Sequence, residues 1–337
     1  MNKKTVRDID VKGKKILMRV DFNVSLLNGK IEDDLRIKQT IPTIEYLLKQ
    51  NCQIILISHL GRPDGKVVPE LSLKPVGEIL AKLLGKEVSF GEVKGKISLL
   101  ENLRFNPGEE ANTEEFSRQL ASLGEVFTND AFGVCHRVEA STVGVTKFLP
   151  AVAGLLLEKE VEMITKVMEN PQRPLVVIIG GAKLETKVGL LNKLLIKADQ
   201  ILVGGMVANE LIEEKKQDKK MVLPIDGLPQ MDQMKDIGPK TCEQFGKIIE
   251  GAKTIIWNGP MGMFEKPEFA GGTEFIYQAI KKNKDALSIV GGGDTLAALN
   301  KNKDYVTSFT HVSTGGGAML ELIEKGSLPG IDALMDK

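Results

Sequence analysis

The sequence predicts an α/β protein with two domains, each built around a parallel sheet. The chain has 337 residues, which is more than one compact core usually contains. Short continuous apolar segments alternate along it with longer amphipathic segments. This pattern is typical of parallel strands that are buried on both faces and connected by helices. The alternation forms two series, which are separated near residue 150.

The first series alternates strands with helices and ends in a proline. Strands are predicted at 16–20, 54–57, 97–100 and 126–128, and amphipathic helices at 72–84 and 113–123. Phe148-Leu149-Pro150 closes the series, and 151–169 is predicted as one long helix that leads into the second half. Asn170-Pro171 ends this helix, because the residue before a proline disfavours helical geometry.

The second series repeats the alternation. Strands are predicted at 175–179, 201–203, 254–257, 287–290 and 308–312. Amphipathic helices are predicted at 183–197, 239–250, 273–282 and 318–325. The simplest architecture is therefore two α/β domains joined by a helix.

Composition excludes several classes of protein. Forty-five basic residues balance 45 acidic ones, which argues against nucleic-acid binding through bulk charge. The lysines near the start are not followed by the apolar segment that a signal peptide requires. Apolar stretches such as 151–157 are too short to span a bilayer. Cys52, Cys135 and Cys242 are odd in number and widely spaced, so we expect reduced thiols and a cytoplasmic location.

Arginine follows the predicted strands of the first half. The chain has 37 lysines but only eight arginines, and none of the arginines lies beyond Arg173. From composition alone, drift in the codons of surface residues remains an alternative explanation of this uneven distribution. The strand ends, however, are followed by polar groups that include Asp21, Asn23, His59, Arg62, Arg104 and Arg137, and Arg36 begins the next helix. Because parallel strands end at one edge of a sheet, these groups are expected to form a site for a small polyanion.

Glycine follows the predicted strands of the second half in the same way. The segments are Gly180-Gly181-Ala182-Lys183, Gly204-Gly205, 258–262, 291–295 and 314–317. One such segment is explained by a tight turn alone, but five at one edge favour a phosphate-bearing ligand such as a nucleotide. Neither GxxxxGK[ST] nor GxGxxG occurs. A polyanion site in one domain and a nucleotide site in the other together predict phosphoryl transfer.

Nine motifs in order resemble phosphoglycerate kinase, from about residue 14 to residue 334. They are RVDFN (19–23), SHLGRP (58–63), LLENLRFNPGEE (99–110), NDAFG…HR (129–137), ASTVGV (140–145), GGAKLETK (180–187), WNGPMGMFE (257–265), GGGDT (291–295) and HVSTGGGA (311–318). The resemblance implies two Rossmann-like domains with parallel sheets, joined by an inter-domain helix and hinge. It also implies reversible, in-line transfer between 1,3-bisphosphoglycerate and ADP in glycolysis, with hinge closure.

The resemblance assigns roles to residues at matching positions. It implies 3-phosphoglycerate binding by Asp21, Phe22, Asn23, Arg36, His59, Leu60, Gly61, Arg62, Arg104 and Arg137, with Arg19 in the same basic patch. It implies nucleotide binding by Lys183, Lys187, Asn258, Glu265, Gly292, Gly293, Asp294 and Thr295, with Asp294 on Mg²⁺. Arg36, Lys183 and Gly292 are expected to be catalytic. His136 beside Cys135 suggests a metal pair, but ordinary loop residues are the favoured interpretation.

The resemblance also implies domain limits and a monomer that binds neither nucleic acid nor membrane. The expected limits are 1–153 for the substrate domain, 154–170 for the inter-domain helix, 171–318 for the nucleotide domain and 319–337 for a tail that returns to the first domain. The chain departs from the family between Gly85 and Leu99, which is short, and at Met206, which replaces a glycine. The segment 211–236 is a few dozen residues shorter than the matching segment of family members. This predicts a shallower pocket for the nucleotide base.

Two hypotheses follow from this departure. The first is an active kinase, and the second is a binding or scaffold protein whose nucleotide domain has eroded. Erosion would affect charged groups as readily as loops, yet Arg36, Lys183, Lys187 and Asp294 are present. We therefore favour the enzyme.

The short segment 211–236 predicts weak discrimination between nucleotide bases. Loss of part of the adenine-facing wall removes contacts that differ between bases and keeps the phosphate contacts that all nucleotides share. GTP should replace ATP with a smaller loss of kcat/KM than in a full-length relative assayed side by side. An equal or stricter preference for ATP would show that the remaining loop rebuilds the wall.

Overall fold

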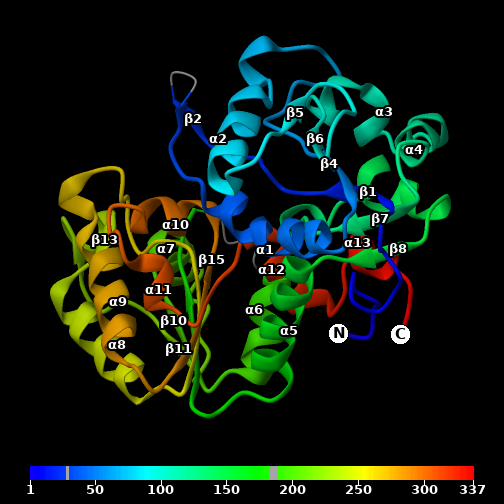
Figure 1. Cartoon of the computed structure of the whole chain (residues 1–337). Coiled ribbons are helices and arrows are strands. Elements are labelled where there is room, and N and C mark those ends of the chain that lie inside the picture. The colour runs from blue at the N-terminus through cyan, green and yellow to red at the C-terminus, as the bar shows by residue number, and fades with distance from the viewer. Residues whose placement is uncertain (28–29, 183–187) are drawn as a thin grey trace. The chain divides into compact units, whose positions relative to one another are not determined.

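The protein divides into two compact units. The computed structural model describes residues 1–27, 30–182 and 188–337. Unit 1 consists of residues 1–162 and 327–337, and unit 2 consists of residues 163–326 (Figure 1). Lys183 and Lys187, which the sequence predicts to bind the nucleotide, lie outside the described residues.

Unit 1 is built on a six-stranded parallel sheet with the order β5-β6-β4-β1-β7-β8. The strands are β1 (Lys15–Arg19), β4 (Gln53–Ile57), β5 (Ser89–Phe90), β6 (Ile97–Leu99), β7 (Val126–Asn129) and β8 (Ala151–Ala153). The central strands are apolar and almost completely buried, as in Ile54 and Leu56. Burial on both faces explains why these strands appear in the sequence as continuous apolar segments.

Helices cover both faces of this sheet. The helices of unit 1 are α1 (Leu35–Lys49), α2 (Lys74–Leu84), α3 (Pro107–Glu110), α4 (Glu114–Ala121) and α13 (Pro329–Asp332), together with the first part of α5 (Leu155–Glu169). Helices α1 and α2 contact each other on one face, and α4 lies on the other (Figure 1). A short antiparallel pair, β2 (Leu26–Leu27) and β3 (Lys30–Ile31), lies between β1 and α1 in the chain.

Unit 2 repeats the plan with the sheet order β11-β10-β9-β14-β15-β16, again parallel. Its strands are β9 (Leu175–Ile179), β10 (Gln200–Val203), β11 (Met221–Val222), β14 (Thr254–Asn258), β15 (Leu287–Gly291) and β16 (His311–Val312). A separate antiparallel pair is formed by β12 (Gly227–Leu228) and β13 (Asp236–Ile237). This pair lies at the end of the segment 211–236, which the sequence predicts to be shortened, and Ile237 is the first residue beyond that segment.

The helices of unit 2 also lie on two faces. They are α6 (Val188–Lys197), α7 (Gly205–Glu213), α8 (Pro239–Gly251), α9 (Gly271–Lys282), α10 (Gly293–Leu299), α11 (Tyr305–Ser308) and α12 (Gly316–Lys325). Helices α6 and α12 contact each other, as do α8 and α9, and the two pairs cover opposite faces (Figure 1). The predicted α/β class with two parallel sheets is thus confirmed. Among the described residues, no helix is both long and apolar enough to cross a membrane.

Two element predictions were wrong in detail. Residues Ala151–Ala153 form strand β8, which pairs with β7, and only then does helix α5 begin. Pairing with a buried neighbour decided the conformation of this short apolar segment, which periodicity alone cannot assign. In the predicted strand 308–312, only His311 and Val312 are extended, and α11 occupies the residues up to Ser308.

The division into units differs from the expected domain limits at the C-terminus. The boundary at residues 162 and 163 falls inside α5. Helix α12 belongs to unit 2 because it packs on α6, so the return to unit 1 begins at Ser327 rather than at residue 319. The tail is then held by backbone hydrogen bonds, from Gly330 to the Cys135 carbonyl (2.8 Å) and from Met335 to the Ala151 carbonyl (3.0 Å).

The start of α5 depends on a buried carboxyl group. Asp130 follows β7 and is completely buried, and its Oδ1 accepts hydrogen bonds from the backbone of Leu156 (2.9 Å) and Leu157 (3.2 Å). Its Oδ2 has no hydrogen-bond partner among the described residues. Burial raises the pKa of Asp130 from 3.8 to about 7, although the hydrogen bonds it accepts oppose this shift.

The raised pKa predicts that Asp130→Asn flattens the pH dependence of the unfolding free energy. The folded-state pKa lies above the unfolded value, so the stabilising contribution is complete below pH 3.8 and is lost as the pH rises through about 7. Urea unfolding should be measured between about pH 4 and pH 8. Over this range the unfolding free energy of the wild type should fall more steeply with pH than that of the variant, by at most about 1.4 kcal/mol per pH unit. Parallel losses in the two proteins would contradict this.

Candidate active site

Polar side chains at the carboxyl ends of the unit 1 strands line one cavity of about 190 Å³. Asp21 and Asn23 follow β1, His59, Gly61 and Arg62 follow β4, Arg104 follows β6, and Arg137 follows β7. Arg36, in the first turn of α1, also lines the cavity. The strands are parallel and end at the same edge, so residues up to 116 positions apart in the sequence reach one place.

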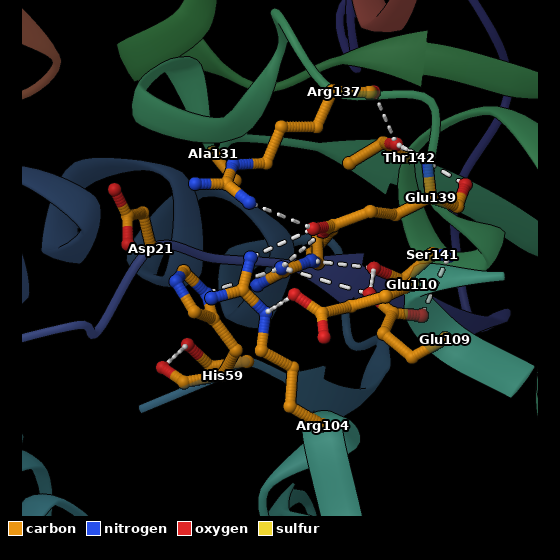
Figure 2. Close-up of polar contacts among 12 residues, drawn as sticks. Asp21, His59, Arg104, Glu109, Glu110, Ala131, Arg137, Glu139, Ser141 and Thr142 are labelled. Atoms are coloured by element: carbon orange, nitrogen blue, oxygen red, sulfur yellow. Dashed lines mark hydrogen bonds and ion pairs between the residues drawn. The ribbon is translucent and has the colours of Figure 1, made fainter. Parts of the chain in front are cut away.

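Glu139 lies behind this cavity and contacts several guanidinium groups (Figure 2). Its Oε1 lies 2.7 Å from Arg104 Nη2 and 3.5 Å from Arg137 Nη1, and its Oε2 lies 3.8 Å from Arg19 Nη2. Glu139 is 3% exposed. A buried carboxylate is retained only when cations compensate its charge, and three arginines do so here.

Arg19 is buried completely beneath the cavity. Its Nε donates to Ser141 Oγ (2.7 Å), its Nη1 donates to the Val20 carbonyl (2.6 Å), and its Nη2 lies 3.9 Å from Glu109 Oε1. Burial raises the pKa of Glu109, and the positive charge of Arg19 opposes that shift. Arg19 therefore organises the site from below and does not line the cavity.

The arginines of the cavity differ in their exposure and in the number of contacts they make with other protein groups. Arg104 is 2% exposed, and it donates to the Gly61 carbonyl (3.0 Å) and pairs with Glu110 (3.3 Å) in addition to Glu139. Arg36 and Arg137 have side chains that are 29% and 33% exposed. Arg62 is exposed and has no ion pair within the part of the chain described. The guanidiniums accessible to a ligand are thus those of Arg36, Arg62 and Arg137.

Arg36 is aimed by groups that follow β1. Its Nη1 donates to the Asn23 carbonyl and lies 3.6 Å from Asp21 Oδ2. The Asn23 side chain in turn accepts from the backbone of Gly61 (2.9 Å), whose φ of +64° is in the left-handed region. A side chain at position 61 would also meet Leu71, so glycine lets the chain turn closely against the cavity.

His59 is a neutral member of the site. It is 2% exposed, and burial lowers its pKa well below 6.5, with further lowering by Arg19, Arg104, Arg137 and Arg36. Arg19 Nη2 lies 3.3 Å from His59 Nδ1. A guanidinium only donates hydrogen bonds, so Nδ1 is the acceptor and the proton resides on Nε2. His59 is therefore a hydrogen-bond donor without charge.

Two of the predicted substrate residues lie outside the cavity lining, and three unpredicted ones lie in it. Phe22 and Leu60 are buried, and their backbone N–H groups donate to Ser58 Oγ (2.9 Å) and Asn102 Oδ1 (3.2 Å). Gly133, Val134 and His136 line the cavity instead. The sequence favours an ordinary loop role for His136. Its position next to Arg137, after the same strand, is the signal that could have identified it.

The glycine segments of unit 2 pack backbone against backbone at the carboxyl edge of its sheet. A Cβ added to Gly180 would lie 2.1 Å from the Pro260 carbonyl oxygen, and one added to Gly259 would lie 2.2 Å from the Gly180 oxygen. One added to Gly316 would lie 2.3 Å from Gly292 Cα. These loops approach so closely that no side chain fits between them.

The predicted nucleotide residues divide into buried and exposed groups. The Asn258 amide donates to the Gly291 carbonyl (2.9 Å), and Thr295 Oγ1 accepts from the Gly259 backbone (2.7 Å), so both residues join neighbouring loops. Gly292 has a φ of +109° and precedes α10, in whose first turn Gly293 and Asp294 are exposed. Glu265 is exposed as well.

Each unit thus offers half of what a phosphoryl transfer requires. Unit 1 provides accessible guanidiniums and a neutral imidazole for a small polyanion, and unit 2 provides glycine loops that expose backbone groups. The fold and these sites define a phosphotransferase with two α/β units. The sequence model of the family "Phosphoglycerate kinase" matches residues 6–219 and 210–326, and the chain belongs to this family.

Known relatives agree with this assignment over the whole chain. The phosphoglycerate kinases of Pelotomaculum thermopropionicum and Thermosipho africanus are each 43% identical to it, over all of this chain and 100% and 99% of theirs. The structure is similar to phosphoglycerate kinase from Coxiella burnetii (TM-score 0.83, 37% identity) and from Pyrococcus horikoshii (TM-score 0.87, 29% identity), each over 98% of both chains. The predicted family and fold are confirmed.

The comparisons also bear on the length of the chain. The alignment with the Pelotomaculum relative extends over 395 positions, whereas this chain has 337 residues, so at least 58 positions have no counterpart here. The family model matches the chain in two parts, which overlap at residues 210–219, near the start of the segment predicted to be short. The enzyme is a phosphotransferase with a carboxyl acceptor, and its reaction connects 1,3-bisphosphoglycerate and ADP with 3-phosphoglycerate and ATP in glycolysis.

The geometry of His59 predicts that its imidazole stays neutral as the pH falls through 6.5. Nitrogen-detected NMR of the imidazole rings should show the Nε2–H tautomer of His59 without a titration step near that pH. The signal can be assigned by its loss in His59→Gln, and His136 and His311 provide reference signals in the same sample. A titration midpoint near 6.5 for His59 would contradict the buried, arginine-surrounded position.

Proposed function

We propose that the arginine-lined cavity of unit 1 binds 3-phosphoglycerate and 1,3-bisphosphoglycerate. The observation that carries this proposal is the convergence of Arg36, Arg62 and Arg137 on one cavity, each with an accessible guanidinium. A planar guanidinium fork matches a phosphate or a carboxylate with two parallel hydrogen bonds. His59 adds a donor without adding charge, and Asn23 fixes the turn at Gly61.

We propose further that Arg36 is a catalytic residue. It is partly exposed, and Asp21 and Asn23 hold it in a fixed direction, so no reorientation is needed when charge develops on the phosphoryl group in flight. The acceptor is a carboxylate that is already ionised at neutral pH, so the reaction requires no general base. Lys183 and Gly292 complete the proposed catalytic set.

The nucleotide is proposed to bind along the glycine loops of unit 2. Gly292, Gly293 and Thr295 would surround its phosphates at the start of α10, Lys187 would contact them, and Asn258 and Glu265 would hold the nucleoside. The Asp294 carboxylate is exposed and has no ion pair in the described part of the chain, so it fits a role as ligand of the Mg²⁺ that accompanies the nucleotide. Magnesium neutralises phosphate charge and is commonly held by one or two carboxylates plus the phosphates themselves.

The wider setting is proposed on the same basis. In-line transfer with hinge closure would bring the two substrates together and exclude water. We propose a monomer in the cytoplasm, where three buried free thiols, Cys52, Cys135 and Cys242, would remain reduced.

A coupled assay with purified protein, Mg²⁺, ATP and 3-phosphoglycerate tests the proposed activity directly. Arg36→Ala should lower kcat by about 10³-fold, with little change in the KM for either substrate, because its contact is strongest in the transition state. A circular dichroism melt confirms that the variant is folded. Near-normal kcat with a raised KM would place Arg36 among the binding residues only.

The exposed position of Arg62 predicts that Arg62→Lys is not a conservative change. An ammonium provides a point charge where the guanidinium provides a fork, so affinity for 3-phosphoglycerate should fall by about tenfold or more. Calorimetry with each ligand separately is the measurement, and affinity for ATP should stay unchanged. Equal losses for both ligands would place Arg62 outside the substrate cavity.

A further inference from the structure

Glu139 lies just behind the substrate cavity and contacts its arginines without lining it. Of the cavity residues, Arg104 and Arg137 both approach Oε1 of Glu139, at 2.7 Å and 3.5 Å. Arg19, below the cavity, approaches Oε2 at 3.8 Å. One carboxylate thus faces three guanidiniums, and two of these belong to residues that line the cavity.

The two oxygens of Glu139 are used differently. Oε1 accepts a short hydrogen bond from Arg104 Nη2, whereas Oε2 is buried and has no hydrogen-bond partner among the described residues. A buried acceptor without a hydrogen bond costs free energy. Its retention here indicates that the negative charge, and not only the hydrogen bond to Arg104, matters for this cluster.

Glu139 is also held firmly in place by its own chain. Its backbone N–H donates to Thr142 Oγ1 (3.0 Å), and the same hydroxyl donates to the Arg137 carbonyl (2.9 Å). This closes the chain between Arg137 and Thr142 into a compact turn. The backbone that carries Glu139 is therefore fixed by this turn, and the carboxylate itself is held by its ion pairs with Arg104, Arg137 and Arg19.

We propose that Glu139 is a positioning residue that limits the anion affinity of the substrate cavity, because its carboxylate partly neutralises the charge of Arg104 and Arg137. The inference rests on the proposed function of that cavity. Among the described residues, five arginines (19, 36, 62, 104 and 137) lie at the cavity or beneath it, against four carboxylates (Asp21, Glu109, Glu110 and Glu139). The excess within this set is a single positive charge.

This near-balance has a consequence for turnover. A cavity lined by four uncompensated arginines would bind substrate, product and simple anions tightly, and uniform tight binding lowers KM without raising kcat. With Glu139 in place, Arg104 and Arg137 are oriented before the ligand arrives, and part of their charge is already neutralised. The ligand then gains from fixed donors without being held too tightly to leave.

Calorimetry with sulfate, a dianion of constant charge, tests the proposal. Glu139→Gln keeps the shape and an oxygen for Arg104 but removes the charge, so sulfate affinity should rise by about tenfold. The KM for 3-phosphoglycerate should fall, and kcat should not rise. A purely structural role predicts the opposite, because disturbed arginines would bind both anions more weakly.

Two further variants complete the test. Glu110→Gln is the matched control, since Glu110 also pairs with Arg104 but is 40% exposed and screened by water, so its effect on sulfate affinity should be clearly smaller. Glu139→Asp retains the charge but withdraws it by one methylene, and should raise sulfate affinity by only about threefold. If Glu139→Gln does not fold, Glu139→Asp decides the matter. Unchanged or weaker sulfate binding in a folded Glu139 variant overturns the proposal.

Failure of this inference is distinguishable from failure of the proposed function. Arg62→Ala should weaken both sulfate and 3-phosphoglycerate binding if the cavity is the substrate site. If Arg62→Ala has no effect on either ligand, the location of the substrate site is wrong. If Arg62→Ala weakens binding and the Glu139 variants fail to strengthen it, only the role of Glu139 is wrong.

Discussion

The pairing of Arg19 with Glu109 and Glu139 is the constraint on which the arrangement beneath the arginine-lined cavity of unit 1 depends. A guanidinium at the end of a buried strand, fully excluded from water, requires compensation by carboxylates that are equally buried. Glu109 comes from α3 and Glu139 from the turn after β7, and Ser141 bonds to both Arg19 and Glu109. Three segments distant in the chain are thereby fixed around one charge, and Arg104 and Arg137 are in turn positioned by their contacts with Glu139.

In the described part of unit 2, the loops at the carboxyl edge of the sheet are joined mainly through their backbones. Its loops meet through glycine backbones, as at Gly180 against Gly259 and at Gly292 against Gly316. Asn258 and Thr295 then join adjacent loops by hydrogen bonds. The difference agrees with the proposed ligands, because a small polyanion is held by directional side-chain forks, whereas a chain of phosphates is approached most closely by bare backbone. Five of the eight arginines serve the first arrangement, while Arg7, Arg118 and Arg173 pair with acidic side chains elsewhere.

Much of the candidate site could be predicted because the rule that locates it is simple. Parallel strands end at one edge, so polar residues that follow apolar segments meet there, and this rule alone groups Asp21, His59, Arg62, Arg104 and Arg137. The rule says nothing of residues that act through others. Glu109 lies inside the motif 99–110 and Glu139 lies between two motifs, but neither residue follows a strand end. Their importance is visible only when the guanidiniums around them are placed.

The sequence by itself determined the fold class, the family and the sheet edges at which the polar residues of unit 1 and the glycine segments of unit 2 gather, because periodicity and strand-end residues are local properties of the chain. Tertiary structure decided which arginines remain accessible to a ligand and which are taken up by buried carboxylates. It also decided that Ala151–Ala153 is a strand, through pairing with β7, and that Phe22 and Leu60 lie outside the cavity lining. Each of these depends on partners far away in the sequence, and burial and charge compensation act only once those partners are in contact.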